Sequence, residues 1–424
     1  MSSIIFDSVE LVNSTYAPQY IKHESAPERD LSIMDLAREG GAILISEKYG
    51  KKYITVIGSL KAASQSALET AIDSFKELFS RVEKNLDISW GGGTRRYVAT
   101  CQEHTFERSH LNITFVPWRA VFVVVSGIGE DTSETTLVNN DDFTAASKSG
   151  SLTFLGSAEP KPRIRVKCGV AATDPKGICI ENTDKGERFI ITRSAGLGAG
   201  EYFEMDCRLK TAKYDGDAVP FYGVFPDWIV GANAYKIQIG KILDQSFTGG
   251  TAAAGFDIYV NTWEAQSFTV PNRDATYQAI SLYLKTGPLG ITTNLTVEIQ
   301  GDSAGEPDGT PVTNAEFDIA YGDVGTSFAW ITVYSTNAFT LAANTRYWTV
   351  IKCAGGDASH YYEVGYVSGV DATYKRGCYA LSTDGGSNWN AVATQDLWFK
   401  LYYGGKEDAA KTYYFDVYYY KRYL

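Results

Sequence analysis

The sequence contains few of the residue patterns that hold metals or cross membranes. It has only 4 His, and none has a second His or Cys at zinc-ligand spacing. The 6 Cys form no Cys-x-x-Cys pair, so we expect thiols rather than a disulfide framework. The longest strongly apolar stretch, Ala120 to Val125, is far shorter than the ~20 residues of a membrane-spanning helix. We therefore expect no cofactor, no metal and no membrane span.

Basic residues are also scarce, since 39 Lys and Arg stand against 50 Asp and Glu and the net charge is -11. A protein that follows a phosphate backbone needs a basic surface, so nucleic acid is not an expected partner. The N-terminus lacks the basic and long apolar segments of a secretory signal, so we expect a protein that is made in the cytoplasm and is not exported by that route.

What the sequence does contain is chain length, glycine and aromatic residues. A chain of 424 residues predicts about three domains. The 44% hydrophobic content is typical of a globular protein, and 28 Tyr beside 40 Gly favour many strands joined by tight turns. We predict a mainly β protein.

Residues 1–150 are expected to form an α+β domain. One strand is predicted on each side of the turn Tyr49-Gly50-Lys51. A helix is predicted to begin near Ser66, where Ser66 and Glu69 form a capping box. A hairpin is expected around Gly91-Gly92-Gly93, and a further strand from Leu111. The apolar face of the helix repeats every three or four residues, at Leu68, Ile72, Phe75, Phe79 and Val82.

The rest of the chain is expected to contain a linker and two β-sandwiches. Residues 126–160 have the composition of a linker or an extended arm, and residues 151–248 alternate apolar and charged positions, as in a sandwich with one solvated face. Small-residue breaks near 249 and 404 bound a second sandwich at residues 249–410. We interpret this segment as an insertion, after which residues 411–424 return to complete the middle domain.

One loop contains a possible match to a catalytic serine motif and three possible calcium ligands, but the sequence around it is typical of a turn. Gly301 to Gly305 matches the G-x-S-x-G pattern, but loop residues follow instead of a helix, so we expect a β-turn. Asp302, Glu306 and Asp308 are weak candidates for calcium ligands. We predict no catalytic residues and no enzymatic activity.

Aromatic residues offer the best candidates for ligand binding. Ser382 to Trp389 resembles an Asp-box turn, in which the Asp caps the turn and the Trp packs beneath it. Exposed aromatic rings can stack on sugar faces, and Trp263, Trp389 and Trp398 are the candidate carbohydrate-binding residues in residues 249–410. Tryptophans of this kind belong more often to a core than to a binding platform.

Taken together, these features resemble the distal tail proteins (Dit family) of siphophages. The resemblance rests on the order of elements from Gly58-Ser59-Leu60 to Arg95-Arg96-Tyr97, on Phe225-Pro226-Asp227-Trp228 with Gly231-Ala232-Asn233, and on the closing Tyr418 to Leu424. It covers residues 1 to about 245 and 411–424.

The resemblance implies a function for each part of the chain. The N-terminal domain would form a six-fold ring at the virion tail tip, as a baseplate hub that contacts tail-tube and tail-tip proteins, and residues 151–248 would be galectin-like. Residues 249–410 resemble jelly-roll carbohydrate-binding modules, which implies adhesion to a host cell-surface glycan. The alternative is a carbohydrate-active enzyme or a free-standing carbohydrate-binding adhesin.

Overall fold

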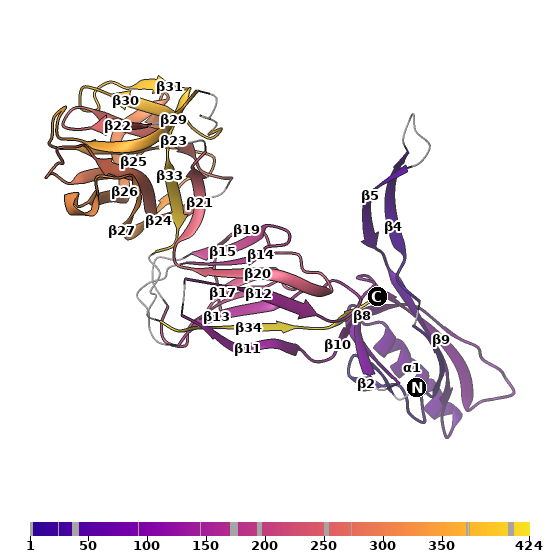
Figure 1. Ribbon diagram of the computed structural model, residues 1–424. Helices are drawn as coiled ribbons and strands as arrows, with labels where there is room; N and C mark the ends of the chain where they lie inside the picture. Colours follow the sequence, from indigo (N-terminus) through magenta and orange to yellow (C-terminus); the bar gives the residue numbers. More distant parts are fainter. Residues whose placement is uncertain are drawn as a thin grey trace.

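The computed structural model describes residues 3–23, 25–35, 42–91, 93–144, 146–169, 177–192, 197–249, 254–272, 274–369, 372, 374–405 and 411–424. The predicted fold class is confirmed, because most of the described residues lie in strands and their only α-helix is α1. Figure 1 shows an N-terminal domain, a middle sandwich and a second sandwich following one another, with a two-stranded ribbon projecting from the first. We call the second sandwich the module.

The N-terminal domain is one curved sheet with a helix on one face. The strand order is β2-β1-β7-β8-β9-β6-β3, and β10 pairs with β8 and with β35. The helix α1 (Gln65–Phe79) buries its apolar side chains against this sheet, in a cluster centred on Phe75, Phe79, Trp118 and Phe122. The strands are β1 (Ser3–Phe6), β2 (Val9–Glu10), β3 (Pro18–Lys22), β6 (Lys52–Lys61), β7 (Lys84–Trp90), β8 (Gly93–Phe106), β9 (Phe115–Val124), β10 (Gly129–Asp131) and β35 (Arg422–Tyr423).

The helix begins slightly earlier than predicted. Its N-cap is Ser64, whose hydroxyl accepts a hydrogen bond from the Ala67 amide at 3.2 Å. Ser66 lies inside the helix, and the Glu69 carboxylate pairs with Arg108 instead of closing a capping box. Val82, predicted on the buried stripe, lies beyond the helix and is 64% exposed. The hairpin around Gly91 forms as predicted, but the strand expected from Leu111 begins only at Phe115.

The strand before Gly50 has a different partner from the one the sequence suggests. Strand β6 is paired on both edges, with β9 and with β3, and so has no edge left for β5 (Ala42–Tyr49). Strand β5 pairs with β4 (Arg29–Asp35) instead, from Arg29 opposite Tyr49 to Asp35 opposite Ala42. These two strands form a separate sheet, which we call the ribbon.

The middle sandwich starts within the segment that was predicted to be a linker. That prediction is wrong, because residues 135–154 form β11 and β12, one in each sheet; the expected boundary at residue 150 falls inside β12. One sheet has the order β11 (Thr135–Phe143), β34 (Tyr413–Tyr419), β13 (Arg163–Cys168), β16 (Tyr202–Asp206), β17 (Thr211–Tyr214) and β18 (Asp217–Ala218). The other has the order β12 (Ser147–Phe154), β20 (Gly231–Ile239), β14 (Gly177–Asn182), β15 (Glu187–Thr192) and β19 (Phe221–Gly223).

The C-terminal residues connect two domains. Strand β34 is an interior strand of the middle sandwich, between β11 and β13. Strand β35 then reaches the N-terminal domain, where Arg422 lies opposite Glu130 and pairs with its carboxylate at 3.1 Å. The chain end therefore fastens the middle sandwich to the N-terminal sheet.

The module packs a seven-stranded sheet on a six-stranded sheet. Its first strand, β21, begins at Ile242 opposite Tyr403, so the module sheet starts a few residues before the expected boundary. One sheet contains β21 (Ile242–Phe247), β33 (Phe399–Tyr403), β24 (Ala275–Thr286), β29 (Tyr362–Ser368), β22 (Ala254–Ile258), β27 (Ala329–Leu341) and β32 (Gln395–Leu397). The other contains β26 (Glu306–Ile319), β25 (Leu295–Ser303), β28 (Arg346–Cys353), β23 (Trp263–Thr269), β30 (Tyr379–Ser382) and β31 (Asn390–Val392); a 3-10 turn, η1, covers Tyr321–Asp323.

Candidate functional site

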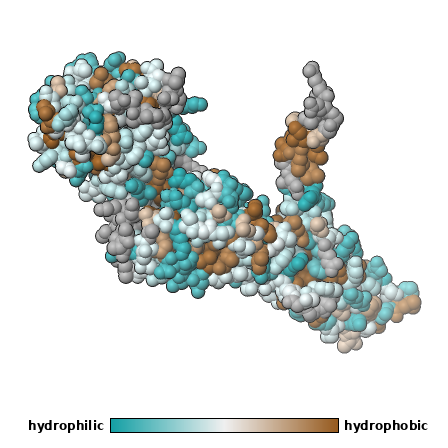
Figure 2. Space-filling view, viewed as in Figure 1, coloured by the Kyte–Doolittle hydropathy of each residue, from teal (hydrophilic) through white to brown (hydrophobic). Residues whose placement is uncertain are grey.

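The ribbon carries the most concentrated exposed apolar surface of the N-terminal domain. Six of its large side chains are between 45% and 59% exposed: Leu31, Ile33, Met34, Ile43, Leu44 and Ile45. Figure 2 shows this hydrophobic patch standing away from the body of the domain. A two-stranded hairpin has little stability of its own in water, and a patch of this kind marks a surface that another molecule covers.

A second apolar surface lies on the sheet of the same domain, on the face that α1 does not cover. Tyr53 and Ile57 alternate along β6 with the buried Ile54 and Val56, so they point away from the helix. Tyr20 on β3 lies opposite Ile57 in the register and is 55% exposed. Strand β3 is an edge strand of this sheet. We call this surface the open sheet face.

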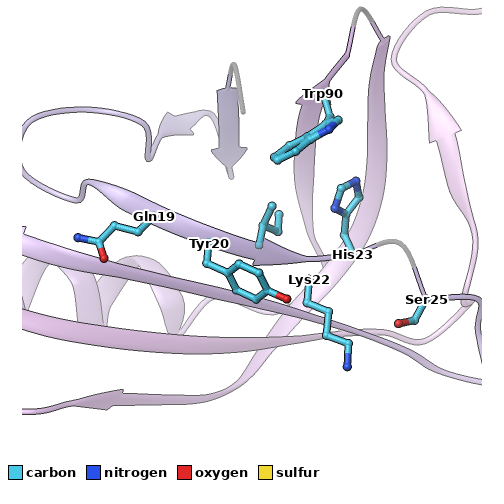
Figure 3. A pocket seen from close by; sticks show the side chains of 7 residues that line it. Gln19, Tyr20, Lys22, His23, Ser25 and Trp90 are labelled. Carbon is cyan, nitrogen blue, oxygen red and sulfur yellow. The ribbon is translucent and has the colours of Figure 1, made fainter.

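A pocket of about 520 Å³ lies beside this edge strand, close to the start of the ribbon. Figure 3 shows that Tyr20, Lys22 and His23 contribute side chains from the β3 segment, while Trp90 comes from the end of β7. The His23 and Trp90 rings are tilted toward each other with centroids 6.0 Å apart. The open sheet face therefore continues into an aromatic hollow.

The middle sandwich and the module meet beside a half-buried carboxylate of the module, Asp244. Asp244 accepts hydrogen bonds from the hydroxyls of Tyr277 and Tyr403, each at 2.6 Å. Burial, followed by the Asp244 charge, raises the pKa of both tyrosines. Tyr222 of the middle sandwich stacks on Tyr403 at 5.1 Å, and Cys179 and Ile190 join the core of the module. The joint therefore has a shared hydrophobic core and is not a loose tether.

The structure separates the three predicted carbohydrate-binding tryptophans. Trp263 and Trp389 lie together on the outer face of the six-stranded sheet, where both pack on the fully buried Trp348 and its neighbours. The Trp263 indole donates to the Val260 carbonyl at 3.2 Å, and Lys352 lies over its ring. Both predicted residues are half-buried and help to cover a small hydrophobic cluster.

Trp398 belongs to the other sheet. It lies parallel to Trp330, with an interplanar angle of 5° and centroids 6.1 Å apart, and Tyr283 contacts both rings. Sequence analysis did not identify Trp330 or Tyr283, because nothing near them resembles a motif. Tyr283 alternates with the buried Leu282 and Leu284 in β24, and Trp330 precedes Ile331, which packs on the core; this alternation is the signal that could have placed them on one face.

Two carboxylates of the turn at residues 301–309 accept hydrogen bonds from the module itself. Strands β25 and β26 form a hairpin with Ser303 opposite Glu306, and Ala304 and Gly305 have positive φ, so the G-x-S-x-G match is a β-turn as predicted. Asp302 accepts from the Trp348 indole at 2.8 Å, and Asp308 accepts from the Thr310 amide at 2.9 Å. In the described part of the chain, no group of three or more His, Cys, Asp or Glu is arranged to hold a metal.

The Asp-box turn has the predicted capping. The Asp384 carboxylate accepts from the Ser382 hydroxyl at 2.9 Å and from the amide and side chain of Asn388. These hydrogen bonds, led by that of the Asn388 side chain, lower the pKa of Asp384 to about 2. Trp389 packs on the same small cluster as Trp263, and the ring that lies against Gly386 of the turn is that of Trp263. This segment has a structural role.

A buried carboxylate, Glu264, lies inside the module. Glu264 points between the two sheets and is 1% exposed. Burial raises its pKa well above the ordinary value, so the folded module favours the protonated form.

All six cysteines also lie in the described chain, and none of them is in a disulfide; burial raises the pKa of Cys207 to about 12. Among the described residues, no helix is long and apolar enough to span a bilayer.

Comparisons with known proteins give structural matches only. The crystal structure of the SPP1 Dit protein, described as a paradigm of the hub adsorption apparatus in phages that infect Gram-positive bacteria, is similar to this chain with a TM-score of 0.42 and 15% identity, over 57% of this chain and 99% of that one. The phage P2 baseplate in its activated conformation is similar with a TM-score of 0.31 and 8% identity, over 56% and 96%. No family model and no curated protein matches the chain.

Proposed function

We propose that this protein is a structural component of a phage virion, a distal tail protein whose copies form a ring at the tail tip. The ring would join the tail tube to the tail-tip or baseplate proteins, as the sequence resemblance implies, and would contain six copies. The middle sandwich would extend outward from the ring and carry the module, whose task would be adhesion to a host cell-surface glycan.

The ribbon is the observation that carries this proposal. Its six half-exposed side chains leave on the order of 500 Å² of apolar surface in water, at the upper end of the largest patch on a typical monomer. Burial of that area would be worth about 12 kcal/mol at ~25 cal/mol per Å², before the cost of association. A second molecule that covers the ribbon therefore stabilises it substantially.

The open sheet face supplies a matching surface on the same domain. Tyr20, Tyr53 and Ile57 are each at least 37% exposed, and one edge of β3 pairs with no strand in the described part of the chain. Contact between the ribbon of one copy and the sheet face of the next joins two different surfaces. Such head-to-tail contacts generate a ring when the rotation between copies closes.

A ring would also suit a module with weak binding sites. Several modules on one rigid hub raise the effective concentration of each site for a repeating cell-surface polymer. The joint favours this arrangement, because Cys179 and Ile190 of the middle sandwich pack in the core of the module and Tyr222 stacks on Tyr403.

The mass of the purified full-length protein in solution tests the ring. Light scattering should give six times the 46.5 kDa mass of the chain, and dilution should not produce a continuous series of smaller species. A protein that remains at the mass of one chain at concentrations up to ~100 μM would contradict the proposal, because a surface of this size should associate well below that concentration. Release of new reducing ends from a bound polysaccharide would favour the enzyme alternative.

A further inference from the structure

The outer face of the seven-stranded sheet of the module carries an ordered patch of side chains. Strands β27, β24 and β33 run side by side, and Tyr283 lies opposite Trp330 in the register. Two residues further along the strands, Ser281 lies opposite Thr332 on one side and Lys400 on the other. The residues between these positions, such as Leu282, belong to the core, so the patch points outward. We call it the aromatic–lysine face; its residues are Tyr283, Phe328, Trp330, Thr332, Trp398 and Lys400.

Its aromatic rings form one connected surface. Tyr283 is in contact with Phe328, Trp330 and Trp398, with ring centroids between 5.0 and 5.3 Å apart. All four rings are half-buried and so keep part of their area in solvent. Planar rings held in this way offer apolar area to the C–H face of a sugar, and the Thr332 hydroxyl beside them can bind a sugar hydroxyl.

Of the lysines on this face, Lys285 lies over the Phe328 ring and pairs with Glu363, whereas Lys400 has no carboxylate partner among the described residues. The Lys400 ammonium lies 3.8 Å from the centroid of the Trp330 ring, and no carboxylate of the described residues lies within 4.0 Å of it. Partial burial, and then repulsion from Lys241, lower the pKa of Lys400. Lys241 also has no carboxylate within that distance in the described chain, and its ammonium lies over the neighbouring Tyr402 ring at 5.1 Å. An anion between the two lysines would relieve their repulsion.

We propose that the aromatic–lysine face is a binding site for an anionic glycan. A sugar ring stacks on Trp330 and Trp398, and a carboxylate or phosphate group on the same polymer pairs with Lys400 and Lys241. This inference deepens the proposed function, on which its biological meaning rests, because it names the site and the chemical class of the surface polymer. It also selects one of the two sheets of the module.

The opposite sheet provides an internal comparison. There Lys352 lies over the Trp263 ring at 5.2 Å, which is a similar pairing of an ammonium group with an indole. Lys352, however, forms an ion pair with the buried Glu298, so its charge is already neutralised. The Trp263 face therefore has the stacking groups without a cation available for an anionic ligand.

The test uses the full-length protein and three immobilised polysaccharides. Polygalacturonate supplies carboxylates, a phosphorylated mannan supplies phosphates, and dextran is neutral. Binding is measured at low and high salt for the parent and for K400Q, W330A, K352Q and W263A, with circular dichroism to verify the fold of each. We expect K400Q to weaken binding to at least one anionic polymer roughly tenfold and to reduce its salt dependence, since a charge-assisted contact is lost.

The controls determine how each outcome is interpreted. W330A should abolish binding to the same polymer, while K352Q and W263A should bind like the parent. Equal losses in K400Q and K352Q, unchanged binding by K400Q, or no binding of the parent to any anionic polymer would each overturn the inference. Light scattering on the same samples separates the two proposals: a ring without glycan binding removes only this inference, whereas binding by a single-chain protein removes only the ring.

Discussion

Replacement of two ribbon isoleucines by serine should separate the copies of the ring without unfolding the chain. Ile33 and Ile45 are 57% and 59% exposed, so each has about half of its side-chain burial still to gain from a partner. Full burial of an isoleucine is worth about 1.5–3 kcal/mol, which leaves roughly 1–1.5 kcal/mol for each residue in the contact. The double variant I33S/I45S should therefore lose about 2–3 kcal/mol per contact, which corresponds to a ~30- to 150-fold weaker association.

The assay is light scattering over a dilution series, combined with thermal unfolding of each variant. Because both side chains are already largely in solvent, the unfolding temperature of the single chain should change little. The matched control is Val82→Ser, which makes a similar apolar-to-polar change at a residue that is 64% exposed but lies outside both the ribbon and the open sheet face. Parent-like assembly of I33S/I45S, or an equal loss in the Val82 variant, would refute the reasoning.

Three further predictions concern the module. Asp244→Ala leaves the buried Tyr403 hydroxyl without its acceptor, so denaturant titration should give a free energy of unfolding of the module about 2–4 kcal/mol lower than in the parent. Tyr403→Phe should lower the free energy of unfolding by a smaller amount. Equal stability of Asp244→Ala and the parent would contradict this role. Glu264 has a raised pKa in the folded state, so the free energy of unfolding should fall as pH rises above about 4.5. Glu264→Gln should reduce the change of melting temperature with pH between pH 5 and 8. A variant whose melting temperature changes with pH as much as that of the parent would show that Glu264 is not responsible. Replacement of residues 242–403 by a short Gly/Ser linker should leave a ring of lower mass, because Gly240 and Gly404 already lie in contact; loss of cooperative unfolding would place the boundaries elsewhere.

The helix and the hairpin around Gly91 could be predicted because their signals are local. The spacing of Leu68, Ile72 and Phe75 alone determines which face of α1 is buried. Strand pairing is not local, and the partner of β5 could not be found from its own residues. An apolar alternation such as Leu31 and Ile33 looks the same whether the cover is the core of the same chain or another copy, so the ribbon was not recognised as a separate element.

The candidate glycan site was only partly accessible from sequence for a related reason. Residue type alone made Trp398 a candidate, but it could not show that Trp263 and Trp389 lie on the other sheet of the module. The register of β24 with β27 and β33 brings Tyr283, Trp330 and Lys400 together from segments more than 40 residues apart. Only the tertiary pairing of these strands reveals the patch.

Electron-microscope images of the full-length protein, taken from the peak whose mass has been measured, test the ring most directly. We predict class averages with six-fold rotational symmetry, in which the N-terminal domains form the closed centre and the modules lie at the periphery. Images of I33S/I45S should show single elongated chains. Single chains in the images of the parent protein, at a concentration that favours association, would contradict the account.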